Sequence, residues 1–176
     1  MQPFVSLTGI AVPLLLDDVN TDQIAPADRS HGLNADLKKM LFNRWKAADP
    51  DFVFNRPQFQ NPSILVARDN FACGSSREMA VWTMTANGIR CIVARTIADI
   101  FKENCLRNGV LTVELDVPTA EAFEGKVLAA DGAHAQFDQL LGVLREILGV
   151  GEVNHAPLDR AGHAGVGHDQ QGFRGQ

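Results

Sequence analysis

Cysteine is scarce in this sequence of 176 residues, which has three, and no two of them form a C-x-x-C pair. A disulfide framework and a zinc or iron–sulfur site held by this chain are therefore not indicated. The odd number of cysteines also fits a reducing compartment. Cys91 lies among β-branched residues, so we expect it to be a small buried hydrophobe of a strand.

A long apolar run is also missing. The stretch 10–16 is short and is interrupted by Pro13, so it cannot span a bilayer. Residues 1–10 lack the positively charged region, followed by an apolar stretch, that a secretory signal has. These features predict a cytoplasmic protein with no membrane partner.

Positive charge is in the minority, because 16 Lys and Arg stand against 21 Asp and Glu, for a net charge of -5. No dense basic run could follow a phosphate backbone, so we expect no nucleic acid partner. The nucleotide-binding patterns G-x-x-x-x-G-K-[ST] and G-x-G-x-x-G do not occur. The G-x-S-x-G elbow of serine hydrolases is absent too, and neither His31 nor His134 has a supporting context.

The composition is that of an ordinary globular chain, with 45% hydrophobic and 21% charged residues. We expect one main domain over residues 1–150, which is long enough to bury a sizeable core. Residues 151–176 have hardly any apolar anchor, which predicts a disordered tail. Three histidines in that tail are expected to be solvated rather than metal ligands, and no metal site is predicted: His155, His163 and His168.

The middle of the chain alternates between two kinds of pattern. Apolar or β-branched runs predict strands at 64–67, 89–94 and 110–115. The intervening segments, 75–87 and 97–108, are long enough for helices, and each is followed by a glycine, as expected just after a helix end. This β-α-β-α-β order predicts an α/β fold with a mainly parallel sheet covered by helices.

The second of these helices should pack on the sheet through one stripe, formed by Ile97, Ile100, Phe101 and Cys105. The remaining expectations are a strand at 9–16, a loop at 17–26, a helix at 35–45, an irregular connection at 47–62, a short strand at 127–130 and a helix at 137–148.

The chemistry of the chain is concentrated after the strand at 64–67, where the sequence reads G-S-S-R-E. Taken alone, Ser75 and Glu78 form the S-x-x-E pattern of a capping box, which is a structural feature. However, Gly74 gives backbone freedom, and two hydroxyl groups meet the guanidinium of Arg77 at the positive end of a helix. An arginine fork matches a carboxylate, so a small dicarboxylic acid is the expected ligand.

Four blocks carry a family resemblance. They are V-N-T-D-Q-I-A-P at 19–26, D-F-V-F-N-R-P-Q-F at 51–59, N-F-A-C-G-S-S-R-E at 70–78 and R-C-I-V-A-R-T-I-A-D-I-F-K-E-N-C-L-R-N-G-V-L at 90–111. In order and spacing they resemble the swivelling β/β/α domain of the aconitase family, and most closely the small subunits of its 3-isopropylmalate dehydratase branch.

The resemblance implies a hydro-lyase that is active only as a heterodimer with a large subunit. That partner is expected to carry a four-iron four-sulfur cluster, and this chain is expected to bind no cofactor. The implied reaction interconverts 2- and 3-isopropylmalate by dehydration and rehydration in leucine biosynthesis. Removing a proton beside a carboxylate and expelling hydroxide both need a Lewis acid, which nothing in this chain supplies.

The same resemblance assigns roles to residues. Ser75 is the implied catalytic base, stabilised by a helix N-terminus and nearby positive charge. The implied substrate-binding residues are Ser76, Arg77, Arg29 and Asp22, and the supporting residues are Gly74, Glu78, Asn70 and Thr21. Glu78 is expected to cap the helix and orient the arginine, while Thr21, Asp22 and Gln23 shape the neighbouring loop.

The chain departs from the family pattern at three places. Met79 stands where the family usually has histidine, and Ala72 where glycine is frequent. The segment 27–32 reads A-D-R-S-H-G, and its Arg29 and His31 suit a more polar substituent than a branched alkyl group. Three alternatives therefore stay open: a hydratase for another 2-hydroxy diacid, of the methylmalate/citraconate or homoaconitate type; a non-catalytic anion-binding module; and a self-sufficient hydrolase.

Overall fold

A computed structural model of the chain describes residues 7, 9–26, 36–75 and 77–130. Within them, four strands form one sheet in the order β1-β2-β3-β4, and every neighbouring pair is parallel. The strands are β1 (Ala11–Pro13), β2 (Ile64–Val66), β3 (Cys91–Ala94) and β4 (Leu111–Glu114). The predicted α/β fold with a parallel sheet is confirmed, and so are the three strands predicted in the middle of the chain, which are β2, β3 and β4.

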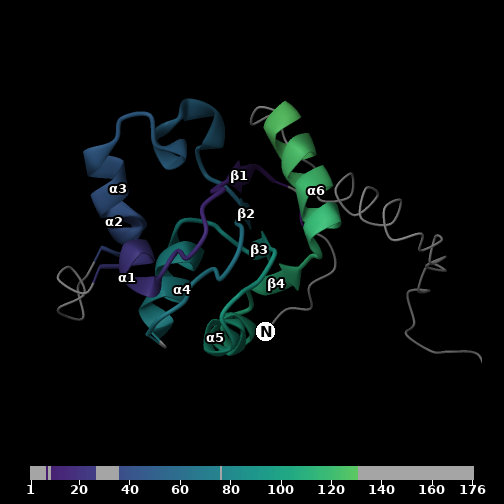
Figure 1. Cartoon of the computed structure of the whole chain (residues 1–176). Coiled ribbons are helices and arrows are strands. Elements are labelled where there is room, and N and C mark those ends of the chain that lie inside the picture. Colours follow the sequence, from purple (N-terminus) through teal and green to yellow (C-terminus); the bar gives the residue numbers. More distant parts are fainter. Residues whose placement is uncertain (1–6, 8, 27–35, 76, 131–176) are drawn as a thin grey trace, which may run out of the picture.

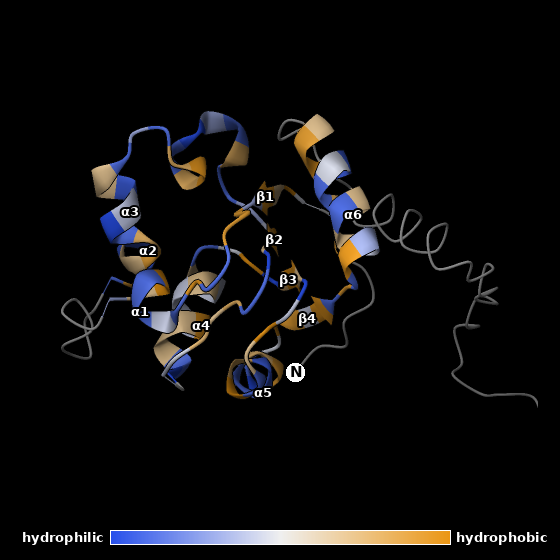
Figure 2. Cartoon of the chain, in the orientation of Figure 1, coloured by the Kyte–Doolittle hydropathy of each residue, from blue (hydrophilic) through white to orange (hydrophobic). Residues whose placement is uncertain are grey.

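Strands β1, β2 and β3 are apolar because both of their faces are buried, whereas β4, at the edge of the sheet, is only partly buried. Side chains alternate between the faces, so Leu65 packs into one core cluster while Ile64 and Val66 pack into the other. Figure 2 shows the strands as hydrophobic ribbons between helices that are mixed in character. Cys91 is fully buried in β3, as expected, and burial raises the pKa of its thiol to about 12.

Helices cover both faces of the sheet (Figure 1). One face carries α6 (Val117–Ala129), whose Phe123 and Val127 pack onto Ile64 and Val66. The opposite face carries the remaining helices: α1 (Thr21–Ile24), α2 (Leu37–Met40), α3 (Asn43–Ala48), α4 (Glu78–Ala86) and α5 (Asp99–Arg107). No helix in the described ranges is long and apolar enough to cross a membrane.

The glycines that follow α4 and α5 take the expected left-handed conformation. Gly88 has φ +93° and Gly109 has φ +70°. The amide of Ile89 donates to the carbonyl of Met84 over 3.1 Å, and the amide of Val110 donates in the same way to Cys105 over 2.9 Å. Both helices therefore end in a hydrogen-bonded C-terminal cap. This cap needs a residue with positive φ, which glycine adopts with little strain.

Several sequence predictions are wrong in detail. The helix expected at 35–45 is two short helices, α2 and α3, because Phe42 between them is left-handed, with φ +50°. The loop expected at 17–26 contains α1, and the irregular connection at 47–62 contains two short 3-10 turns, Val53–Asn55 and Pro57–Phe59. Ile100 is 55% exposed, so the apolar stripe of α5 excludes it.

The strand expected at 127–130 is also wrong, because those residues form the end of α6 (Val117–Ala129). The helix begins where the carboxylate of Asp116 accepts the amide of Thr119 over 2.9 Å, with Pro118 in the first turn. Val127 is apolar because it faces the sheet from a helix. The helix expected at 137–148 and the tail at 151–176 lie outside the described residues.

A cluster of charged side chains attaches α6 to the sheet. Glu124, whose side chain is 7% exposed, accepts from Arg68 over 3.2 Å and from Arg95 over 3.3 Å. Arg68 follows β2 and Arg95 follows β3, so one carboxylate joins two strand ends to the helix above them. Arg95 also faces Asp69 at 3.6 Å.

Replacing Glu124 by leucine is therefore expected to lower the free energy of unfolding by about 3 kcal/mol, because the guanidinium of Arg95 loses its buried partner. Urea denaturation would measure this loss. The matched control is Glu121→Leu: Glu121 contacts the same arginine at 3.7 Å but its side chain is 63% exposed, so a change within about 1 kcal/mol is expected. Equal losses in the two variants would contradict the assigned role.

Candidate functional site

The carboxyl ends of β1, β2 and β3 meet at one edge of the sheet, where open α/β folds usually bind ligands. The segment after β2 lies between the segments that follow the other two strands. On one side, the amide of Asp18 donates to the carbonyl of Asp69 over 3.0 Å, and the side chain of Asn70 donates to the carboxylate of Asp18 over 2.8 Å. Asn70, predicted as a supporting residue, therefore connects the loops after β1 and β2.

On the other side, Thr96 holds the same segment. Its hydroxyl oxygen accepts the amide of Asn70 over 2.6 Å, and its carbonyl accepts the amide of Phe71 over 3.0 Å. The carbonyl of Phe71 in turn accepts the amide of Ala98. The sequence analysis missed Asp18 and Thr96, since a lone polar residue after a strand carries no signal until its partner is known.

Three residues of the loop between β2 and α4 have a left-handed backbone conformation. Asn70 has φ +54°, Ala72 has φ +58° and Gly74 has φ +91°. A Cβ at Gly74 would meet only ordinary contacts, so the backbone angle is what favours glycine there. The same argument explains the preference for glycine at the position of Ala72, whose Cβ makes this conformation costly.

Ser75 and Glu78 do not form the predicted capping box. Helix α4 begins at Glu78, its cap residue is Arg77, and no side chain among the described residues caps the first turn. The prediction is wrong because the chain turns after Gly74, and the helix begins three residues later than the predicted start at residue 75. Ser75 is consequently exposed, and its hydroxyl is not used as a helix cap. The uncapped first turn leaves the positive end of α4 open to an anion.

A capping box does occur at the neighbouring helix α1. The side chain of Asn20 accepts the amide of Gln23 over 2.9 Å, and the side chain of Gln23 accepts the amide of Asn20 over 2.7 Å. The pattern N-x-x-Q was the available signal, and the sequence analysis did not use it. The box places Thr21 and Asp22 at the start of α1, facing the loop before α4.

Two contacts join α1 to the loop that carries Ser75. The hydroxyl of Thr21 donates to the carbonyl of Ser75 over 3.0 Å, and the amide of Thr21 donates to the carbonyl of Cys73 over 3.1 Å. The carboxylate of Asp22 forms an ion pair with the guanidinium of Arg77. Residues 55 positions apart in sequence are thus brought together, and the carboxylate that pairs with Arg77 is that of Asp22.

The remaining predicted residues are placed as follows. Arg29, His31 and Ser76 lie outside the described residues. Glu78 occupies the first turn of α4 without the predicted cap bond. Met79, which replaces the usual histidine, is half-buried and packs against the core cluster.

No group of three or more histidine, cysteine or acidic residues converges as a metal site in the part of the chain that the structure describes. Cys91 and Cys105 face opposite sides of the sheet. Burial raises the pKa of each thiol to about 12, so neither is a ready thiolate ligand. Cys73 is half-buried in the loop before Ser75. The described cysteines therefore do not fit an iron–sulfur cluster.

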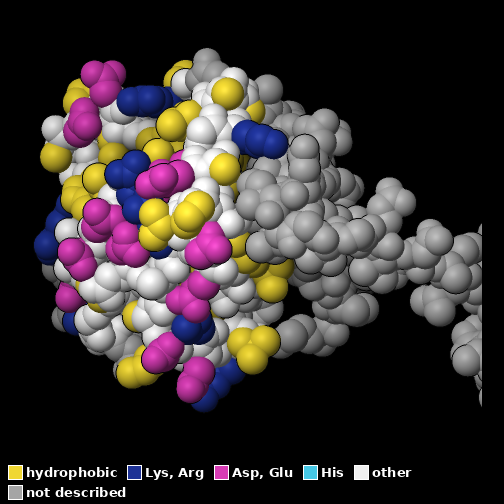
Figure 3. All heavy atoms as spheres, turned by 45° about the vertical axis from the view of Figure 1, so that its right-hand side comes forward, with side chains coloured by type: hydrophobic (Ala, Val, Ile, Leu, Met, Phe, Trp, Pro, Cys, Tyr) yellow, Lys and Arg dark blue, Asp and Glu magenta, His cyan; other side chains and the backbone are white. Residues whose placement is uncertain are grey.

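The surface around α6 shows acidic and basic side chains next to one another, without a continuous basic area (Figure 3). Positive charge near Ser75 comes instead from Arg77, whose side chain is 37% exposed. An exposed hydroxyl, an arginine paired with Asp22 and the uncapped start of α4 therefore lie together, and these groups match the chemistry of a carboxylate.

The comparisons with known proteins agree on one family. The model of the aconitase C-terminal domain matches residues 1–118. The 3-isopropylmalate dehydratase small subunit of Rhodospirillum centenum is 45% identical over 145 residues, covering 78% of this chain and 70% of that protein. Its counterpart in Rubrobacter xylanophilus is 47% identical over 120 residues, covering 68% and 61%.

A solved structure agrees with this family. The crystal structure of 3-isopropylmalate dehydratase from Methanocaldococcus jannaschii matches with a TM-score of 0.51 and 27% identity, over 65% of each chain. This chain thus spans about two thirds of the length of these relatives. The match over residues 1–118 and the shared parallel α/β fold show that the chain belongs to the aconitase C-terminal domain family.

Proposed function

We propose that this chain is the small subunit of a heteromeric hydro-lyase that isomerises 2- and 3-isopropylmalate by dehydration and rehydration. The observation that carries the proposal is the exposed Ser75 beside the ion pair of Arg77 and Asp22, at the start of a helix without a side-chain cap. The relatives named as 3-isopropylmalate dehydratase small subunits support the choice of reaction.

In this proposal, Arg77 binds a substrate carboxylate through its planar fork, and Asp22 holds the fork in one orientation. The open amides of α4 add partial positive charge beside that carboxylate. Ser75 takes the proton next to it, because a hydroxyl at the positive end of a helix loses its proton more readily than one in water.

The electrophilic half of the reaction is assigned to a second polypeptide. A four-iron four-sulfur cluster on a large subunit would supply a Lewis acid for the substrate hydroxyl and carboxylate oxygens. The exposure of Ser75 fits this division, since a reacting group that must meet a partner's cofactor cannot be buried in its own core.

The test is reconstitution of the full chain with a cluster-bearing large subunit. Dehydration of 2-isopropylmalate to the alkene is expected for the mixture and not for either subunit alone. Parallel assays with citraconate and homoaconitate decide between the isopropylmalate reaction and the related hydratases. Co-purification without activity on any of the three substrates would favour a non-catalytic anion-binding module, and turnover by the isolated chain would favour a hydrolase.

The role of Arg77 gives a separate prediction. Replacing it by methionine keeps the aliphatic stem but removes hydrogen bonds to a charged group, so kcat/KM should fall roughly 10- to 150-fold. Steady-state assays of the reconstituted enzyme would measure this. Asp22→Asn should produce a smaller loss, with a folding free energy changed by less than about 1 kcal/mol, because the pair is partly exposed.

A matched control is Arg107→Met. This arginine also pairs with a carboxylate, Glu103, but it lies on α5 and its side chain is 66% exposed. Its replacement should leave kcat/KM unchanged. A similar loss in both arginine variants would show that general charge, rather than the position beside Ser75, determines activity.

A further inference from the structure

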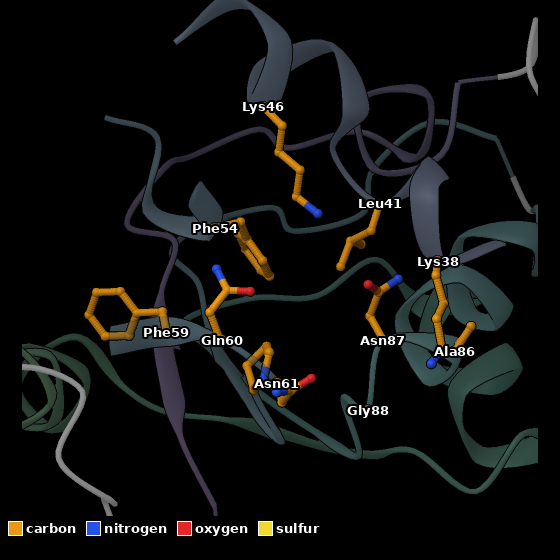
Figure 4. Close-up of a pocket in the computed structure, with 11 residues that line it drawn as sticks. Lys38, Leu41, Lys46, Phe54, Phe59, Gln60, Asn61, Ala86, Asn87 and Gly88 are labelled. Carbon is orange, nitrogen blue, oxygen red and sulfur yellow. The ribbon is translucent and has the colours of Figure 1, made fainter. Parts of the chain in front are cut away.

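A polar cavity lies at the opposite edge of the sheet from Ser75. It has a volume of about 240 Å³ and is lined by residues that precede β2 and β3, including Pro62 and Gly88 (Figure 4). Ser75 follows β2, whereas Pro62 precedes it, and α4 runs between the two places. Because nine helical residues span roughly 13 Å, the cavity is separate from the site described above.

Two lysines line the cavity, and neither has an anionic partner among the described residues. Lys46 of α3 and Lys38 of α2 line it, and Figure 4 shows the ammonium of Lys46 directed between Phe54 and Leu41. The lining includes no aspartate or glutamate, and neither lysine forms an ion pair within the described ranges. Lys39, the neighbour of Lys38, differs because it pairs with Asp36 at 3.0 Å.

Lys46 is the more buried of the two cations. Its ammonium lies 5.6 Å from the centre of the Phe54 ring, and burial lowers the pKa of this amine. Cation–π attraction offsets only part of the cost of removing an ammonium from water. A bound anion would offset the rest, which gives the cavity a preference for negative charge.

Two carboxamides add acceptor groups to the cavity. The amide nitrogen of Asn87 donates to the carbonyl of Thr83 over 2.8 Å, and that of Gln60 donates to the carbonyl of Arg56 over 3.4 Å. The carboxamide oxygens of Asn87 and Gln60 are therefore the acceptors that a ligand can use. They match a donor such as a hydroxyl, while the lysines match a carboxylate.

We propose that this cavity binds a small hydroxy acid, with its carboxylate on Lys38 and Lys46 and its hydroxyl hydrogen donated to the carboxamide oxygen of Gln60 or of Asn87. The volume agrees, since a cavity of about 150 Å³ already holds benzene. The ligand class follows from the cavity itself and does not depend on the proposed reaction at Ser75.

The experiment is calorimetric titration of the full chain with L-malate, succinate and inorganic phosphate. Malate should bind more tightly than succinate, which lacks the hydroxyl, and than phosphate. Lys46→Met and Lys38→Met should each weaken malate binding about tenfold or more, whereas Lys39→Met should not change it. Methionine preserves the buried stem, and thermal unfolding of each variant shows that it is folded.

Arg77→Met separates the two sites, because it removes only the guanidinium that is proposed to bind a carboxylate near Ser75. Malate binding should survive this replacement. The proposal would be overturned if malate failed to bind the full chain, or if Arg77→Met abolished malate binding. It would also be overturned if Lys38→Met and Lys46→Met both bound malate as tightly as the unchanged chain. Tighter binding of phosphate would overturn the carboxylate assignment, and equal binding of succinate would overturn the role of the carboxamides.

Discussion

Replacing Ser75 by alanine is expected to lower kcat of the reconstituted enzyme about 10²- to 10⁴-fold, the usual contribution of a positioned proton-transfer group. The substitution should leave KM and stability almost unchanged, because Ser75 is exposed and the two bonds of its carbonyl, to Thr21 and Arg77, involve the backbone. Steady-state kinetics with 2-isopropylmalate, together with urea denaturation, would separate the two effects.

The control for this variant is Ser63→Ala. Ser63 immediately precedes β2, at the sheet edge opposite Ser75, so activity should be retained. An enzyme with Ser75→Ala that kept its kcat would reject the serine as the base. A drop in stability that matched the drop in activity would instead indicate a structural role.

Replacing Phe71 by alanine should lower the free energy of unfolding by about 3–5 kcal/mol. The ring of Phe71 is fully buried and contacts Phe101 edge to face, with 6.0 Å between ring centres. Such a loss is a large share of the total stability of a domain, which is typically about 5–15 kcal/mol. The denaturation midpoint should fall while the slope of the transition stays the same.

Phe71 also supports the loop that carries Ser75, so activity should fall in Phe71→Ala even where the protein stays folded. Leu106→Ala is the control: Leu106 lies on α5, the helix that carries Phe101, but it is 74% exposed. Its removal should change stability by less than about 0.5 kcal/mol. If the two variants lost equal stability, the packing assigned to Phe71 would be wrong.

Local patterns predicted the regular parts of the fold well. The runs that became β2 and β3 are apolar because both faces of these strands are buried, so their composition alone indicated strands. The edge strand β4 is only partly buried and was indicated by its β-branched and apolar residues. Gly88 and Gly109 marked helix ends because the left-handed conformation is cheap for glycine. Val127 failed as a strand signal because a short apolar run is shared by strands and helix faces.

The candidate site was predicted only in part. The G-S-S-R-E motif drew attention to Ser75 and Arg77, and Gly74 adopts the positive φ that the motif required. The capping box was wrong because the motif gave the residues of a cap but not the position at which α4 begins. The pairing of Arg77 with Asp22 joins residues from two loops, so no local pattern contained it.

The sequence by itself determined the parallel α/β fold, the family resemblance and the residues around which a carboxylate site was expected, because these depend on local composition and short motifs. Only the tertiary structure decided which charges meet. It paired Asp22 with Arg77 and left the cavity lysines, Lys38 and Lys46, without a carboxylate among the described residues. Such pairings depend on where separate chain segments meet when the sheet forms, and this information is not local in sequence.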